Sequence, residues 1–118
     1  MSEALTHLLV IDDEDYQLDL IQNSFSKSNQ FRLTCLESIS KAHEFLFINS
    51  VDLILSDLWL KDGEGTELIP EALKKNIPII IMTGQGDENL AVEIMKLGAF
   101  DYFVKNHLLY PELPHKIN

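Results

Sequence analysis

Four short runs of almost uninterrupted apolar residues constrain the fold more than any other feature of this chain. They are His7–Asp13, Val51–Asp57, Ile77–Thr83 and Ala99–Lys105. Continuous runs of this length are typical of strands that are buried on both faces of a parallel sheet. A fifth run, Phe31–Leu36, alternates polar and apolar residues more, which indicates a strand at the edge of the sheet.

Helical patterns fill the intervals between these runs. Apolar residues recur at helical spacing in three sets: Leu18, Ile21 and Phe25; Ile39, Ala42 and Leu46; and Leu90, Ile94 and Leu97. This spacing predicts helices with one buried face. Ser38 and Asp87 are candidate N-caps, and Gly98 is a candidate stop. A shorter helix is expected over Thr66–Lys75, where Pro70 lies in the first turn or marks the start of regular helix.

The alternation of strand and helix, repeated five times, predicts an α/β fold with a parallel sheet covered by helices on both faces. Right-handed crossovers and one reversal of winding give a flavodoxin-like, doubly wound, five-stranded sheet of order 2-1-3-4-5. Phe31–Leu36 and Ala99–Lys105 are then its two edges.

The C-terminal segment predicts a fifth helix from the spacing of Leu109, Leu113 and Ile117. Pro111 and Pro114 lead us to expect a late start, and the chain ends within about two turns. We therefore expect this helix to be truncated, and residues 1–118 to be one domain of a longer protein.

Composition excludes several classes of function. A chain of 118 residues suits one domain, it has no apolar run near the ~20 residues of a membrane helix, and we expect no signal peptide. Acidic residues outnumber basic ones 19 to 9, giving a formal charge of -10, which disfavours binding to nucleic acid. Cys35 is the only cysteine, so no internal disulfide can form and a cytoplasmic location is expected.

Polar residues stand where four of the five strands are expected to end. Asp12 and Asp13 end the first strand, Asp57 the third, Thr83 the fourth and Lys105 the fifth. Because the carboxyl ends of parallel strands share one edge of the sheet, where ligands bind near the reversal of winding, we expect these five side chains to form one cluster.

The chemistry of this cluster points to a cation and a phosphoryl group. Two carboxylates ~4 Å apart repel by about 4 kcal/mol at an effective dielectric of ~20, and Lys105 supplies only one positive charge. Oxygen ligands without thiolates or paired histidines favour Mg²⁺, which leaves coordination positions for phosphate oxygens. A hydroxyl and an ammonium beside a carboxylate suit phosphoryl transfer with the carboxylate as nucleophile.

The sequence resembles the receiver domains of two-component response regulators along nearly its whole length. The segments that carry the resemblance are "VIDDEDY" (Val10–Tyr16), "LILSDLWLKDGEG" (Leu53–Gly65), "IIIMTGQG" (Ile79–Gly86) and "GAFDYFVK" (Gly98–Lys105). Each segment alone is a weak signal. The ordered set of two aspartates, a third aspartate, a threonine and a lysine, each ending its own strand, is highly specific.

The resemblance implies a role for each site residue. Asp57 would accept a phosphoryl group from a phosphohistidine on a sensor histidine kinase or a phosphotransfer domain. Asp13, Asp57 and the backbone carbonyl of Trp59 would bind Mg²⁺ directly, and Asp12 would act mainly through water. Such a domain catalyses only its own phosphorylation and dephosphorylation and is otherwise not an enzyme.

The resemblance also implies a switch. Thr83 would hydrogen-bond the phosphoryl oxygen, Lys105 would form an ion pair with it, and Tyr102 would swing inward as the switch aromatic. The change would then be presented on the face made by the Leu90–Leu97 helix, the fifth strand and the last helix, where a homodimer could form. An effector or kinase domain after residue 118 would read the signal.

Three positions depart from the family pattern or adjust it. Asn106 follows Lys105 where the family usually has a cis proline, so the geometry of this peptide is open. The resemblance implies that Trp59 and Gln85 occupy the positions that tune the lifetime of the phosphate. Trp59 either shields the phosphoryl group from water or only covers the loop and meets a partner, and both interpretations stay open.

Two rival functions and two weak signals complete the sequence interpretation. A degenerate receiver would act as an interaction or dimerisation module without phosphate, which the full residue set disfavours. A Mg²⁺-dependent phosphohydrolase would need an acid where Trp59 stands. The glycine segments "GEG" and "GQG" are interpreted as turns. The histidines have no ligand spacing and are interpreted as surface or structural residues: His7, His43, His107 and His115.

Overall fold

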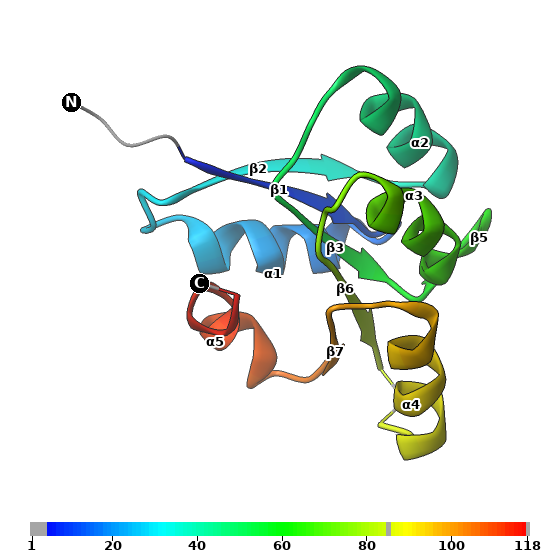
Figure 1. The fold of residues 1–118 in the computed structure, drawn as a ribbon. Coiled ribbons are helices and arrows are strands. Elements are labelled where there is room, and N and C mark those ends of the chain that lie inside the picture. The colour runs from blue at the N-terminus through cyan, green and yellow to red at the C-terminus, as the bar shows by residue number, and fades with distance from the viewer. Residues whose placement is uncertain (1–4, 85, 118) are drawn as a thin grey trace.

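One parallel sheet of five strands forms the centre of the protein (Figure 1). The computed structural model describes residues 5–84 and 86–117. The strands are β1 (Thr6–Ile11), β2 (Phe31–Leu36), β3 (Leu53–Asp57), β6 (Ile79–Thr83) and β7 (Asp101–Val104). Their spatial order, β2-β1-β3-β6-β7, confirms the predicted order 2-1-3-4-5. The edges are β2 and β7, as expected.

Helices follow the strands at the predicted places. They are α1 (Asp15–Phe25), α2 (Ile39–Ile48), α3 (Ile69–Lys74), α4 (Glu88–Leu97) and α5 (Leu109–Lys116), and a 3₁₀ turn, η1 (Gly65–Leu68), precedes α3. Pro70 therefore lies in the first turn of α3. The predicted caps are confirmed: Ser38 Oγ accepts from the backbone N–H of Lys41 at 3.1 Å, Asp87 caps α4, and Gly98 ends α4 at φ +113°.

The alternation of side chains along β1 divides the core into two layers. Leu9 and Ile11 belong to the layer that α2, α3 and α4 cover. Leu8 and Val10 belong to the layer that α1 and α5 cover. Figure 1 shows the two groups of helices on opposite sides of the sheet. Burial on both faces is why the interior strands have continuous apolar sequences.

The strand register brings the carboxyl ends together. Ile11 of β1 lies opposite Ser56 of β3, and Asp57 lies opposite Met82 of β6. Thr83 lies opposite Val104 of β7. The residues directly after β1 and β7, Asp12 and Lys105, therefore reach the same edge as Asp57 and Thr83.

Helix α5 begins earlier than the sequence predicted. It starts at Leu109, with Pro111 in its first turn and Pro114 inside it, so the expected late start is wrong. A first-turn proline costs little because the N–H that it lacks has no partner there, whereas Pro114 removes one helical hydrogen bond. Burial of Leu109 and Leu113 against the α1 side of the core outweighs that loss.

A small hairpin after β3 was not predicted. Strand β4 (Trp59–Leu60) pairs antiparallel with β5 (Gly63–Glu64). Between them, Asp62 accepts hydrogen bonds from the backbone N–H groups of Ile39 and Ser40, both at 3.0 Å. These bonds hold the pKa of Asp62 below its usual value. The hairpin therefore ties the loop after Asp57 to the N-terminus of α2.

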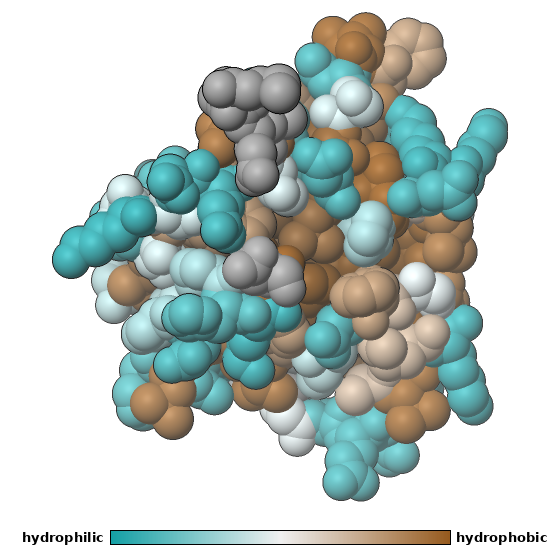
Figure 2. All heavy atoms as spheres, turned by 60° about the vertical axis from the view of Figure 1, so that its left-hand side comes forward, coloured by the Kyte–Doolittle hydropathy of each residue, from teal (hydrophilic) through white to brown (hydrophobic). Residues whose placement is uncertain are grey.

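The surface is mixed, and apolar side chains reach it at several places. Figure 2 shows hydrophobic side chains gathered near the middle of one face with hydrophilic ones around them. The most exposed large apolar side chains include Phe47, Ile48, Phe100 and Leu108. Among the described residues, the helices are all too short or too polar to span a bilayer.

Candidate functional site

Three carboxylates meet at the carboxyl edge of the sheet. Asp12 is fully buried, Asp57 is 6% exposed, and Asp13 is partly exposed. One oxygen from each lies within 4.8 Å of the others. The structure thus brings together the three acids that the sequence placed at two different strand ends.

Lys105 supplies the positive charge of this cluster. Its Nζ lies 3.2 Å from Asp12 Oδ2 and 3.0 Å from Asp57 Oδ2. One ammonium group thus pairs with two of three carboxylates, and the cluster keeps a surplus of negative charge when all groups are ionised. A surplus of this kind in a partly buried site raises a carboxyl pKa or attracts a cation.

The pKa values of the cluster reflect this balance. Burial raises the pKa of Asp57, and the charge of Lys105 only partly opposes that effect. Burial acts to lower the pKa of Lys105, but the charges of Asp12 and Asp57 outweigh it and raise that pKa. Lys105 therefore stays protonated, while burial disfavours the ionised form of Asp57.

Backbone groups hold two of the acids in place. Asp12 Oδ1 accepts from the N–H of Glu14 at 3.0 Å, just before α1 begins. Asp13 Oδ2 accepts from the N–H of Lys61 in the hairpin at 2.9 Å. Each acid keeps further lone pairs for other ligands, because an ionised carboxylate can accept about four hydrogen bonds.

Two further predicted residues, Thr83 and Tyr102, lie on the neighbouring strands β6 and β7. Thr83 is buried at the end of β6, and its carbonyl accepts from the N–H of Lys105 at 2.7 Å. Tyr102 is partly buried on β7 and packs against the layer of α2, α3 and α4. The Lys105–Asn106 peptide is trans. The predicted role of Gln85 lies outside the described residues.

The loop after Asp57 contains an exposed tryptophan, Trp59, and a closely packed glycine, Gly65. Trp59 is 56% exposed and pairs with Glu64 across the hairpin. A Cβ on Gly65 would lie 2.2 Å from the carbonyl oxygen of Asp57 and 2.6 Å from Ser56 Oγ. Only glycine allows this approach, so Gly65 fixes the backbone behind Asp57. The sequence suggested only a turn here.

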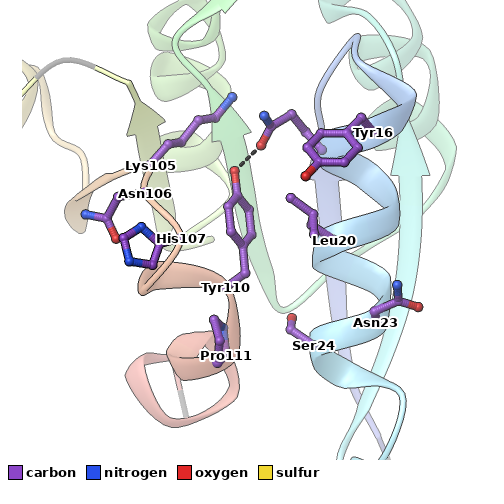
Figure 3. Close-up of a pocket in the computed structure, with 10 residues that line it drawn as sticks. Tyr16, Leu20, Asn23, Ser24, Lys105, Asn106, His107, Tyr110 and Pro111 are labelled. Atoms are coloured by element: carbon purple, nitrogen blue, oxygen red, sulfur yellow. Dashed lines mark hydrogen bonds between the residues drawn. The ribbon is translucent and has the colours of Figure 1, made fainter.

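A cleft between α1 and α5 opens next to the cluster (Figure 3). It has a volume of about 630 Å³, and Lys105 is among its lining residues. The hydroxyl of Tyr110 donates a hydrogen bond to Gln17 Oε1 across it, and burial raises the pKa of Tyr110. The sequence analysis did not identify Tyr110. The only signal in the sequence is a tyrosine directly after Leu109, at the start of the last predicted helix.

Comparison with known proteins gives the family. The sequence profile of the response regulator receiver domain matches residues 8–116. The transcriptional regulatory protein FixJ of Bradyrhizobium diazoefficiens is 37% identical over 101 residues, which cover 84% of this chain and 49% of FixJ. The response regulator SaeR of Staphylococcus aureus is 30% identical over 116 residues, which cover 97% of this chain and 50% of SaeR.

A solved structure agrees with the sequence relatives. The receiver domain of the Francisella response regulator 1452 superposes with a TM-score of 0.82 at 26% identity, covering 96% of this chain and 93% of that one. The chain belongs to the response regulator receiver domain family. The match spans about half the length of FixJ and of SaeR.

Proposed function

We propose that this domain is a phosphoaccepting receiver and that Asp57 takes the phosphoryl group. The observation that carries the proposal is the contact of Lys105 Nζ with Asp57 Oδ2 at 3.0 Å inside a cluster of three carboxylates. Asp57 is buried and is the last residue of the interior strand β3, and the ammonium is placed to receive the new negative charge. Phosphorylation adds roughly one to two negative charges.

The proposed reaction is a transfer between two side chains. A carboxylate oxygen of Asp57 attacks the phosphorus of a phosphohistidine, the P–N bond breaks, and the imidazole leaves with the nitrogen lone pair and takes a proton. Lys105 then pairs with the phosphoryl oxygens, and the Thr83 hydroxyl donates to one of them. Both groups lie at strand ends on the same edge of the sheet as Asp57, where they can stabilise the charge that the transfer brings in.

The acids also fit a hard divalent cation, and we propose Mg²⁺. Asp13, Asp57 and the Trp59 carbonyl would bind it directly, and Asp12 would act through water. The donor set is all oxygen and one acid is partly exposed, which suits an ion that keeps several waters. When bound, Mg²⁺ offsets the charge of the acids and of the incoming phosphoryl oxygens.

The change of state is proposed to reach Tyr102 and the face formed by α4, β7 and α5. Movement of Thr83 toward the phosphate would draw Tyr102 inward, since both lie on neighbouring strands of the sheet. This face is the proposed site of signalling and of homodimerisation. Trp59 and Gln85 are proposed to set the lifetime of the phosphate.

The partners proposed for the domain follow from the family. A sensor histidine kinase or a phosphotransfer domain would donate the phosphoryl group in the cytoplasm. The relatives FixJ and SaeR are about twice the length of the matched region, which supports the proposal that residues 1–118 belong to a longer protein with an effector domain. The degenerate receiver is the weaker alternative, because every residue that the chemistry needs is present.

The test is direct phosphorylation. The chain is incubated with acetyl phosphate and Mg²⁺, and the intact mass is compared for wild type, Asp57→Asn and the exposed control Asp19→Asn. We expect a gain of one phosphoryl mass in wild type and Asp19→Asn and none in Asp57→Asn. Absence of any gain in wild type would support the degenerate alternative.

A further inference from the structure

The turn of the β4–β5 hairpin joins two parts of the protein through neighbouring residues. The backbone N–H of Lys61 donates to Asp13 Oδ2 at 2.9 Å, in the acidic cluster. The carboxylate of the next residue, Asp62, accepts from the backbone N–H groups of Ile39 and Ser40, both at 3.0 Å, at the start of α2. Figure 1 shows the hairpin, labelled β5, beside that end of α2. The position of the turn therefore depends on α2 as well as on the cluster.

The contact of Asp62 with α2 is well formed for an exposed carboxylate. Each of its two oxygens accepts one N–H group, and the first N–H groups of a helix have no partner within the helix. The helix dipole also favours a negative charge at this end. The two hydrogen bonds hold the pKa of Asp62 below its usual value, so the carboxylate is ionised at neutral pH and the contact is retained.

Helix α2 also has a cap of its own. Ser38 Oγ accepts from the backbone N–H of Lys41 at 3.1 Å, three residues further along the chain, as an ordinary N-cap does. Asp62 instead reaches α2 from 22 and 23 residues away. Because this second cap comes from another element, it fixes the position of the hairpin relative to α2 in addition to capping the helix.

Two backbone groups of the hairpin act at the proposed metal site. The carbonyl of Trp59, a proposed ligand of Mg²⁺, lies on β4, where Trp59 pairs with Glu64. The N–H of Lys61 orients the carboxylate of Asp13. Removal of a hydrogen-bond partner that orients a metal ligand typically weakens metal binding by ~10–100-fold. A shift of the turn would move both backbone groups together.

The other strand of the hairpin is restrained separately. The N–H of Glu64 donates to Glu67 Oε2 at 2.8 Å, in a reciprocal pair with the η1 turn. Gly63 has φ +146°, and a Cβ there would lie 3.1 Å from Ile39 Cδ1. We therefore expect β5 to keep its place without Asp62, whereas the part of the turn at Lys61 is the part that Asp62 secures.

We infer that Asp62 is a positioning residue for the proposed Mg²⁺ site and acts through the hairpin turn on Asp13 and on the Trp59 carbonyl. The contact with α2 fixes the turn, the turn keeps the Lys61 N–H on Asp13, and Asp13 is thereby oriented toward the cation. By reciprocity, Mg²⁺ at the cluster tightens the contact between Asp62 and α2. The role of Asp62 rests on the metal site of the proposed function, because Mg²⁺ is the ion that the oriented Asp13 would bind.

The test is titration of the 118-residue chain and its Asp62 variants with Mg²⁺. Trp59 is the only tryptophan and lies on the hairpin, so its fluorescence reports on the hairpin, and calorimetry gives Kd independently. Asp62→Ala should weaken Mg²⁺ binding about tenfold, the lower end of the range for groups that orient a ligand. Asp62→Asn keeps one acceptor oxygen, so its Kd should lie between those of Asp62→Ala and wild type.

Two controls separate positioning from helix stability and from charge. Ser38→Ala removes the other cap of α2 but not the hairpin contact, so it should lower Tm as Asp62→Ala does and leave Kd unchanged. Glu37→Gln removes an exposed negative charge on which the charge of Lys61 acts, and it should change Kd less than about twofold at physiological salt. In EDTA, amide hydrogen exchange of Lys61 should be faster in Asp62→Ala and unchanged in Ser38→Ala.

Three results would overturn the role of Asp62 and leave the proposed metal site standing. The first is equal Kd in wild type and Asp62→Ala. The second is a loss of affinity in Ser38→Ala as large as in Asp62→Ala, because the stability of α2 would then be the cause. The third is a loss in Glu37→Gln equal to that in Asp62→Asn, which would show an effect of charge alone. Absence of Mg²⁺ binding in wild type would instead contradict the proposed metal site, and the role of Asp62 with it.

Discussion

The two ends of strand β1 bury polar groups in opposite ways. At the amino end, His7 is 7% exposed, and both ring nitrogens have partners: Arg32 Nη2 donates to Nδ1 at 3.0 Å, and Nε2 lies 2.7 Å from Thr34 Oγ1. Because arginine can only donate, Nδ1 accepts and the proton is on Nε2. The His7 N–H donates to Asp52 Oδ2 at 2.7 Å. This end is balanced as a neutral network.

The carboxyl end is not balanced by the protein alone. Asp12, Asp13 and Asp57 lie together, and the Lys105 ammonium pairs with only two of them, Asp12 and Asp57. A buried polar group that serves only the fold is normally satisfied internally, as His7 is. A carboxylate cluster with too little positive charge of its own instead attracts a cation from solution. The contrast teaches that the functional end of the sheet is the end where the fold leaves its charges incomplete.

Removal of Lys105 should have the largest effect. Lys105→Met leaves buried Asp12 and Asp57 without their cation, and breaking a buried pair in this way costs about 3 kcal/mol. We expect the free energy of unfolding in urea with EDTA to fall by that amount, and Mg²⁺ to restore part of it. Lys27→Met, at an exposed position, should change it by less than ~0.5 kcal/mol. Equal stability of Lys105→Met and wild type would remove the contrast between the two ends.

Neutralising Asp57 should raise the free energy of unfolding of the metal-free protein, whereas removal of Lys105 lowers it. Because burial raises the pKa of Asp57, its ionised form opposes folding, and Asp57→Asn should raise the free energy of unfolding in EDTA by about 1 kcal/mol. The gain should disappear or reverse in Mg²⁺, which wild type binds better. Thermal melts in the two buffers measure this. A loss of stability in EDTA would show that the acids are already compensated.

The His7 network at the amino end of β1 should make the stability of the fold depend on pH. Burial and the charge of Arg32 lower the pKa of His7 in the folded protein from 6.5. Below pH 6.5 the unfolded chain therefore binds a proton that the folded protein excludes, so this contribution to stability is complete above pH 6.5 and is lost as pH falls toward the folded pKa. Urea unfolding between pH 7.5 and pH 5 should show a shallower decline in His7→Gln. Identical slopes would mean that His7 titrates normally.

Trp59 should have the smallest effect. If its indole shields the phosphoryl group, Trp59→Ala should shorten the half-life of phosphorylated Asp57 by about three- to tenfold, equivalent to roughly 1 kcal/mol of barrier. Decay of the phosphorylated mass after removal of acetyl phosphate measures this. Phe47→Ala serves as the aromatic control. An unchanged half-life would favour the alternative that the exposed indole only covers the loop or meets a partner.

The fold was predictable because its signals are local and repeated. Four of the five strands carry a nearly continuous apolar run, and each of these runs ends in a polar residue of the candidate site. Asp12, Asp57, Thr83 and Lys105 therefore followed from sequence once the strand order was known. Even the caps at Ser38 and Asp87 were visible, since a cap depends on residues two or three positions away.

The unpredicted features depend on contacts between distant segments. Asp62 caps α2 across 22 and 23 residues, and Gly65 is required by the carbonyl of Asp57 behind it. The early start of α5 follows from burial of Leu109 and Leu113, which local rules for Pro114 do not include. His7 was interpreted as a surface or structural residue, but only the structure shows that its network is complete.

The central claim is that the carboxyl end of the sheet lacks a positive charge that a divalent cation supplies. Calorimetric titration of the metal-free chain with Mg²⁺ tests this most directly, with Asp13→Asn and Asp57→Asn as site variants and Asp19→Asn as the control. We predict saturable binding of one ion to wild type and Asp19→Asn, weakened about tenfold or more in each site variant. No saturable binding, or binding that survives unchanged in both site variants, would contradict the account.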